Sequence, residues 1–255
     1  MGAVIVMLLL GAAMAGVAGL DAAEEAITKG GAGGDGFAGS EGDDSFAGGG
    51  GNDLLIGRDG DDSLSGDAGH DWLIGLGGAD QLSGGDGDDV IIGGEGSDMI
   101  DTGSGNDFVE SANIVDEAAL VASLDGVRSI SAIDFRYALP GGSDAPDDVL
   151  LGDGDDTVVA GNGDVLTGNA GADEFTLGDW IEGGDPVEIT DFDAAEDIIA
   201  FIYDTSGPAP DLTIDRNART GVTLVRAGGE TIAVVRDTSP GFSLSNIAVS
   251  RYAAA

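Results

Sequence analysis

Aspartate recurs at every ninth residue through the first part of this chain, and these evenly spaced carboxylates are its main chemical signal. In all nine copies a glycine lies two residues before the aspartate and an apolar residue lies two residues after it. Carboxylate oxygens at fixed intervals suit a divalent cation that prefers oxygen ligands. The aspartates predicted to be metal ligands in this array are Asp35, Asp44, Asp53, Asp62, Asp71, Asp80, Asp89, Asp98 and Asp107.

Each copy is predicted to be a glycine-rich loop followed by a very short strand. Glycine runs such as 48–51 let the backbone take positive φ and turn tightly. The residues after each aspartate alternate, so the apolar residue faces one way and its neighbours face the other. One such strand cannot bury its apolar face alone, and a fixed period of this kind indicates a solenoid of stacked copies.

The repeat resembles that of the RTX, or hemolysin-type, family, in which Gly-Gly-x-Gly-x-Asp-x-apolar-x winds into a calcium-binding parallel β-roll. The stretch Gly84-Gly85-Asp86-Gly87-Asp88-Asp89-Val90-Ile91-Ile92 carries the resemblance. It implies an all-β, right-handed solenoid with two copies per turn and several bound calcium ions. Some copies depart from it and are expected to hold the weakest sites: the second glycine is replaced at Ser40, Arg58, Asp67 and Leu76, and the first at Thr102.

The residues beside the inward position support an eighteen-residue turn, because their character alternates from copy to copy. The pairs Leu54/Ile56, Trp72/Ile74 and Val90/Ile92 are apolar, whereas Ser45/Ala47, Ser63/Ser65 and Gln81/Ser83 are mostly polar. We therefore expect one sheet with an apolar outer face and one with a polar outer face. Exposed apolar surface usually marks an interface, so either another part of this chain or a protein partner is expected to cover that stripe.

Aspartates one turn apart would form two stacks along the edges of the roll. At a strand spacing of ~4.8 Å, two carboxylates repel by ~0.9 kcal/mol in water and ~3.5 kcal/mol at an effective dielectric of 20. A cation between them reverses the sign of the interaction, and calcium suits flexible oxygen coordination better than magnesium. Five aspartates in one stack leave four gaps and four in the other leave three, so we expect seven calcium sites in this array.

Composition limits the classes of partner. The 255 residues carry 9 Lys and Arg against 48 Asp and Glu, a formal net charge of −39, which excludes nucleic acid as a favoured partner. Cysteine is absent and histidine occurs once, so zinc and copper are not expected and no disulfide supports the fold.

Outside the array the chain divides into further segments. Residues 1–20 have no charged side chain and are predicted to be a hydrophobic helix, either a membrane anchor or a signal peptide, with a buried helix of a soluble protein as the alternative. Residues 21–29 form a linker, residues 30–110 the roll, and residues 111–147 an insertion with a short helix over 116–124. This insertion is the leading candidate to cover the apolar stripe.

A degenerate second array is expected over residues 148–178, where Asp148, Asp156, Asp164 and Asp173 are each followed two residues later by an apolar residue. Asp156 and Asp173 are predicted as further calcium ligands, with a purely structural extension of the roll as the alternative. Residues 179–255 are expected to be a β cap, with a hairpin through residues 222–235. The resemblance implies that these last residues also carry a type I secretion signal.

We interpret the chain as a non-enzymatic calcium-binding protein, secreted or held at the bacterial surface, with a structural or adhesive role. One alternative is an RTX-module enzyme that uses carboxylates only, because no His-Glu-x-x-His, Gly-x-Ser-x-Gly or Cys/His motif is present. The other is a partner-binding module that uses the apolar outer face.

Overall fold

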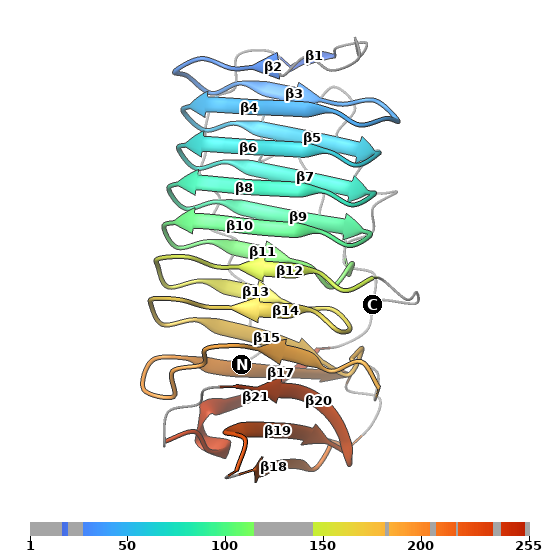
Figure 1. Ribbon diagram of the computed structural model, residues 1–255, viewed down its shortest axis with the longest axis vertical. Helices are drawn as coiled ribbons and strands as arrows, with labels where there is room; N and C mark the ends of the chain where they lie inside the picture. The colour runs from blue at the N-terminus through green and yellow to red at the C-terminus, as the bar shows by residue number, and fades with distance from the viewer. Residues whose placement is uncertain are drawn as a thin grey trace.

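The protein is a long stack of short strands, seen from the side in Figure 1. The structure, a computed structural model, describes residues 17–19, 28–114, 145–181, 184–204, 208–217, 219–236 and 241–252. Within these ranges all regular structure is β, apart from one 3₁₀ turn at Leu244–Asn246. No helix in the described part of the chain is long and apolar enough to cross a membrane.

Two sheets face each other along the stack, and successive strands alternate between them from β1 to β17 (Figure 1). In spatial order, the first sheet contains β1 (Val17–Gly19), β3 (Gly36–Ala38), β5 (Leu54–Asp59), β7 (Trp72–Gly77), β9 (Val90–Glu95), β11 (Phe108–Glu110), β13 (Thr157–Val159), β15 (Glu174–Gly178), β17 (Ile198–Asp204) and β21 (Ile247–Tyr252). We call this the odd sheet, and every neighbouring pair in it is parallel.

The opposite sheet, called the even sheet, ends in the C-terminal hairpins. Its spatial order is β2 (Thr28–Lys29), β4 (Ser45–Gly50), β6 (Ser63–Ala68), β8 (Gln81–Asp86), β10 (Met99–Ser104), β12 (Asp148–Leu150), β14 (Val165–Thr167), β16 (Val187–Ile189), β20 (Glu230–Val235), β19 (Val222–Ala227) and β18 (Leu212–Asn217). The pairs β18·β19 and β19·β20 are antiparallel, and the second of them is the hairpin predicted through residues 222–235. Gly228 and Gly229 form that turn at φ of 60° and 97°.

The sheet register confirms the eighteen-residue turn. Leu55 pairs with Leu73, and Leu73 pairs with Ile91, so each apolar residue stacks on its equivalent one coil away. These side chains point between the sheets and are fully buried. The core is thin in the repeat region and widens near the C-terminus, where Phe175, Phe192 and Phe201 are among the largest buried side chains. A narrow core gives each coil little apolar burial of its own.

The outer faces of the two sheets differ as the sequence predicts. On the odd sheet Leu54, Ile56 and Ile74 are at most 4% exposed. On the even sheet Ser63 and Gln81 are exposed, and Met99 is 62% exposed. The apolar stripe is therefore buried at these residues, and the choice between another part of the chain and a partner as its cover stays a prediction.

The predicted insertion is described only at its two ends, 111–114 and 145–147, and its predicted helix at 116–124 lies outside the described residues. The first of these ends continues over the odd sheet, where Ala112 and Ile114 pack with Val159. After the insertion the stack resumes in register, because Met99 of β10 pairs with Asp148 of β12. The second array therefore extends the same roll.

The hydrophobic helix predicted over residues 1–20 lies mostly outside the described residues. Where the structure describes that segment, at Val17–Gly19, the chain is strand β1 paired in parallel with β3. The prediction of a helix is wrong at these three residues, since the edge of the odd sheet offers unpaired backbone groups that an extended segment satisfies.

Candidate metal centre

The aspartates lie at the loop edges of the roll, where each carboxylate reaches back to the preceding coil. Asp53 Oδ1 accepts the backbone N–H of Asp35 at 2.6 Å, and Asp71 Oδ1 accepts that of Asp53 at 2.7 Å. Asp89 continues the pattern by accepting the N–H of Asp71 at 2.7 Å. The turn of the loop and the eighteen-residue register thus place equivalent carboxylates above one another.

Two continuous stacks result, one along each edge. One stack contains Asp35, Asp53, Asp71, Asp89, Asp107, Asp156, Asp173 and Asp197. The other contains Asp44, Asp62, Asp80, Asp98, Asp147 and Asp164. Every aspartate predicted from the sequence as a ligand lies in one of these stacks, and its role as a ligand stays a prediction.

The assignment of the second array needs one correction. Asp147, not Asp148, occupies the stack position, since Asp147 Oδ1 accepts the N–H of Asp98 at 2.8 Å. Asp148 lies on the outer face of β12, because Val149 rather than Leu150 points into the core. The nine-residue spacing from Asp147 to Asp156 is the sequence signal that would have identified it. Asp197 was also missed, because a longer loop separates it from Asp173.

In the interior of the stacks the second carboxylate oxygen is buried without a hydrogen-bond donor. This applies to the Oδ2 atoms of Asp53, Asp62, Asp71, Asp80, Asp89 and Asp156. These aspartates are at most 2% exposed, so bulk solvent does not reach them. Burying a carboxylate oxygen without a partner is costly, and a bound cation is one of the few ways to offset that cost.

Carboxylates near the N-terminal ends of the stacks are different. Asp35 Oδ2 accepts the N–H of Gly31 at 2.7 Å, and Asp44 Oδ2 accepts that of Ser40 at 2.7 Å. At the C-terminal end of the first stack, Asp197 Oδ2 accepts the N–H of Asp193 at 2.6 Å. The unsatisfied oxygens named above therefore belong to interior coils.

In the first array, a glycine five residues before the stacked aspartate lies at the floor of the loop in every copy except the last, where Thr102 replaces it. A Cβ at Gly75 would lie 2.2 Å from Asp80 Oδ2 and 2.5 Å from the carbonyl oxygen of Gly93 in the next coil. A Cβ at Gly66 would likewise lie 2.4 Å from Asp71 Oδ2 and 2.6 Å from the Gly84 carbonyl oxygen. Carboxylate and carbonyl oxygens thus converge on each glycine, which explains why the repeat has no side chain there.

The second glycine of the repeat needs positive φ, and three of its replacements adopt it. Arg58, Asp67 and Leu76 have φ of 90°, 72° and 83°. Ser40 is not among the non-glycine residues with positive φ. Residues with a Cβ are strained in this region, so these three copies carry backbone strain that a glycine would avoid.

Burial raises the pKa of interior carboxyls in both stacks. It raises the pKa of Asp62 and Asp71 to about 7 and that of Asp89 to about 8, against the opposing effect of the backbone N–H that each accepts. Neighbouring carboxylates of the same stack raise them further, as Asp53 does for Asp71. Without a cation, the interior carboxyls therefore hold protons near neutral pH.

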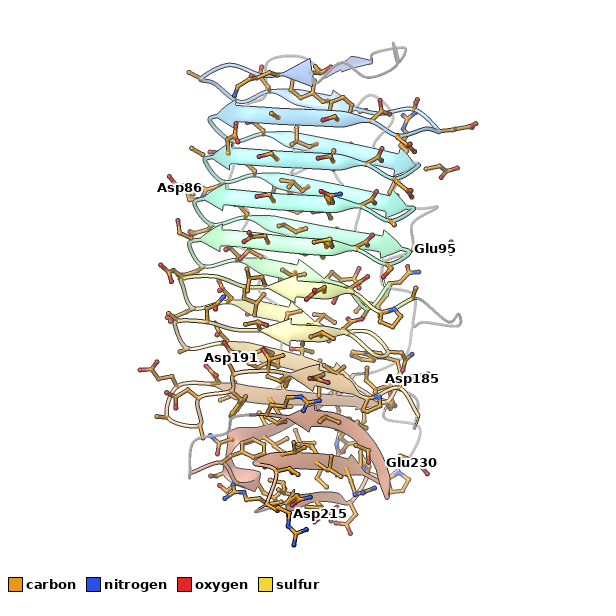
Figure 2. The ribbon with its side chains drawn as sticks, viewed as in Figure 1. Asp86, Glu95, Asp185, Asp191, Asp215 and Glu230 are labelled. Atoms are coloured by element: carbon orange, nitrogen blue, oxygen red, sulfur yellow. The ribbon has the colours of Figure 1, made fainter. Side chains whose placement is uncertain are left out.

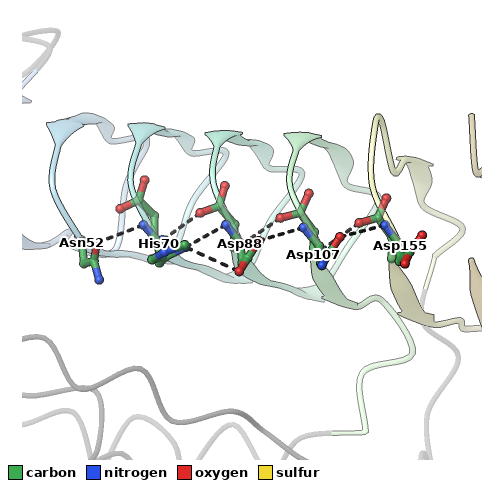
Figure 3. A network of polar contacts seen from close by, with 9 residues as sticks. Asn52, His70, Asp88, Asp107 and Asp155 are labelled. Atoms are coloured by element: carbon green, nitrogen blue, oxygen red, sulfur yellow. Dashed lines mark hydrogen bonds and ion pairs between the residues drawn. The ribbon is translucent and has the colours of Figure 1, made fainter. Parts of the chain in front are cut away.

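A second ladder runs along the loop surface, formed by the residue just before each stacked aspartate (Figure 3). Asn52 Oδ1 accepts the N–H of His70 at 3.1 Å, His70 Nδ1 accepts that of Asp88 at 2.8 Å, and Asp88 Oδ1 accepts that of Asn106 at 3.0 Å. His70, the single histidine, is therefore a half-exposed member of a structural ladder. Acidic side chains such as Asp86 and Glu95 project from the two loop edges (Figure 2).

The donor set fits calcium. Among the described residues no three His, Cys, Asp or Glu side chains converge on one point, so carboxylates alone do not complete a site. Calcium takes six to eight oxygens and accepts backbone carbonyls among them, and the loops supply such carbonyls beside the unsatisfied carboxylate oxygens. The stacked aspartates and the carbonyls of the loop glycines would hold the ion.

Four segments of the chain, residues 38–73, 74–109, 142–164 and 151–179, match the RTX calcium-binding nonapeptide repeat. The chain carries RTX repeats. The matched RTX segments fall on both sides of the insertion, in agreement with the single roll seen in the structure. No curated protein matches the chain.

The extracellular lipase LipA from Serratia marcescens is a solved structure with similarity to this RTX chain, at 18% identity and a TM-score of 0.28. The match covers 85% of this chain and 40% of the lipase, so the chain spans less than half of that protein's length. A TM-score this low carries no argument about fold or activity.

Proposed function

We propose that this protein is a non-enzymatic, calcium-dependent structural protein that works outside the cell, secreted or held at the cell surface. The observation that carries the proposal is the pair of carboxylate stacks, whose interior members are buried with one oxygen lacking a donor. Calcium between successive coils would neutralise these charges and supply the missing partner for each oxygen.

Calcium would then act as the trigger for folding. The RTX roll has a thin core, so little apolar burial is available to offset stacked negative charge, and the free energy of metal binding becomes free energy of folding. Extracellular calcium sites often have dissociation constants of ~0.1–1 mM. Sites of this affinity would be empty in a low-calcium cytosol and filled in a high-calcium exterior. That difference would allow export of an unfolded chain and folding outside the cell, and the resemblance to RTX proteins implies a type I apparatus for the export.

A calcium titration of the full chain tests this function, monitored by circular dichroism and isothermal titration calorimetry. We expect strand content to rise with calcium to a plateau in the millimolar range, with several ions bound per chain. The same strand content in chelator as in millimolar calcium would refute calcium-triggered folding. Magnesium at the same concentration is the control and should produce little change, since it keeps its own waters.

Within this structural function we propose an adhesive role, which the exposed acidic side chains at the loop edges support. A net charge of −39 keeps the roll soluble and lets its edges bind further cations from the medium. Retention of the folded protein on bacterial surfaces in calcium, with release by chelator, tests this role. Equal retention in both conditions would contradict it.

A further inference from the structure

The stack that begins at Asp44 ends at Asp164, and this last carboxylate is bonded differently from the interior ones. Asp62 and Asp80 each accept a backbone N–H through Oδ1, and their Oδ2 atoms are buried without a donor. Asp164 also accepts an N–H through Oδ1, from Asp147 at 3.0 Å. Its Oδ2, however, accepts two further hydrogen bonds, from the hydroxyl of Ser111 at 2.8 Å and the N–H of Gly161 at 2.7 Å.

Ser111 occupies a position that is glycine in the preceding coils along the same edge. Those glycines are Gly39, Gly57, Gly75 and Gly93, each five residues before its stacked aspartate. Ser111 is 0% exposed, and its own N–H donates to the carbonyl of Val159 at 2.9 Å. Its hydroxyl lies 3.3 Å from that carbonyl and 2.8 Å from Asp164 Oδ2, so the carboxylate is the closer acceptor.

The length of the loop brings the second donor into place. Asp164 follows Asp156 by eight residues instead of nine, and Gly161 lies three residues before it. The shortened loop turns the N–H of Gly161 toward Oδ2. Hydrogen bonds to an ionised carboxylate are about twice as strong as neutral ones, and here both partners are shielded from water.

The same place is where the chain leaves the roll for the insertion. Glu110 Oε1 accepts the N–H groups of Ala112 and Ile114, both at 3.0 Å, and so fixes the first residues after β11. Ala112 and Ile114 pack with Val159 of the following coil. The departing chain and the coil that follows the insertion are therefore held together by direct protein contacts.

We propose that Ser111 and Gly161 close the stack at Asp164 to calcium, with their hydrogen bonds in the place that the ion takes in the interior coils. This inference rests on the proposed function, since it assumes that interior coils bind calcium. It defines one end of the metal-binding part of the roll.

The test counts calcium ions bound per full-length chain by native mass spectrometry, in Asp164→Asn and in the matched variant Asp62→Asn from the same stack. We expect Asp164→Asn to bind as many ions as the unmodified protein and Asp62→Asn to bind at least one fewer. A lower count in Asp164→Asn overturns the inference. An unchanged count in Asp62→Asn instead contradicts the proposed function at this stack, and Asp80→Asn serves if Asp62→Asn does not fold.

A second measurement tests the hydroxyl. Ser111→Ala removes one donor to Asp164, so in saturating calcium we expect the amide hydrogens of Asp147 and Gly161, which donate to the same carboxylate, to exchange at least tenfold faster. The calcium count should not fall. Ser111→Thr keeps the hydroxyl and should exchange like the unmodified protein. Unchanged exchange in Ser111→Ala overturns the role of Ser111.

Discussion

Acid should partly replace calcium in folding the roll. In the metal-free roll, burial raises the pKa of Asp53 and Asp80 to about 6 and that of Asp156 and Asp173 to about 7, above their ordinary value of 3.8. A carboxyl whose folded pKa is raised binds more protons when folded than when unfolded. Its contribution therefore favours the folded state at low pH and is lost as pH rises from about 4 toward the folded pKa.

The size of the effect follows from the number of such groups. At pH 5 all seven carboxyls whose folded pKa lies at about 6 to about 8 are protonated in the roll and mostly ionised in the unfolded chain. Each proton taken up on folding changes the free energy of unfolding by ~1.4 kcal/mol per pH unit. Even half of these protons would give a slope of roughly 5 kcal/mol per pH unit, which is large beside a typical domain stability of ~5–15 kcal/mol.

The assay is circular dichroism of the full chain in calcium-depleted buffer between pH 8 and pH 5, with sedimentation velocity to confirm that the protein stays monomeric. We expect strand content to increase as pH falls. The control Asp148→Asn removes an exposed charge on the outer face of β12, outside the stacks, and should behave like the unmodified protein. More structure at pH 8 than at pH 5 without calcium would refute this account of the buried carboxyls.

Three substitutions test other parts of the roll. Gly75→Ala places a Cβ 2.5 Å from a backbone carbonyl oxygen, so we expect the free energy of unfolding to fall by more than ~2 kcal/mol and calcium to bind more weakly. In the control Gly77→Ala the atom nearest to the new Cβ is 3.6 Å away. The free energy of unfolding of this control should change by no more than ~0.5 kcal/mol. Arg58→Gly relieves the strain of positive φ and should stabilise the calcium-loaded protein by ~1 kcal/mol in thermal unfolding, and a loss of stability would contradict that strain. Leu73→Ala removes a fully buried stacked side chain and should cost ~2–5 kcal/mol in denaturant unfolding, while a cost below 1 kcal/mol would mean that the core at this coil is not packed.

Much of the fold could be predicted because the repeat fixes three positions in every copy. Asp, Gly and the apolar residue each have one physical role, and a constant spacing transfers those roles from copy to copy. This was sufficient to place the first array, the eighteen-residue register and the apolar outer face of the odd sheet, seen at Leu54 and Ile74.

Where spacing varied, the prediction weakened for identifiable reasons. At Asp147-Asp148 either aspartate is followed two residues later by an apolar residue, so the alternation of the strand could not decide which one faces the stack. Burial of Val149 beneath the preceding coil decides it. One of the hydrogen bonds to Asp164 comes from Ser111, which is 53 residues away in sequence. A local sequence pattern does not predict a contact between residues so far apart.

The register across the insertion has a consequence for how such a protein tolerates change. Asp98 and Asp147 are 49 residues apart yet bond as if they were neighbours in an unbroken array. Each coil needs only the edge of the previous one as a template, and lengthening the connection between two coils costs little in closure entropy. The connection between β11 and β12 is therefore a natural insertion site. Sequences of very different length can be accommodated there while the coils on either side keep their register.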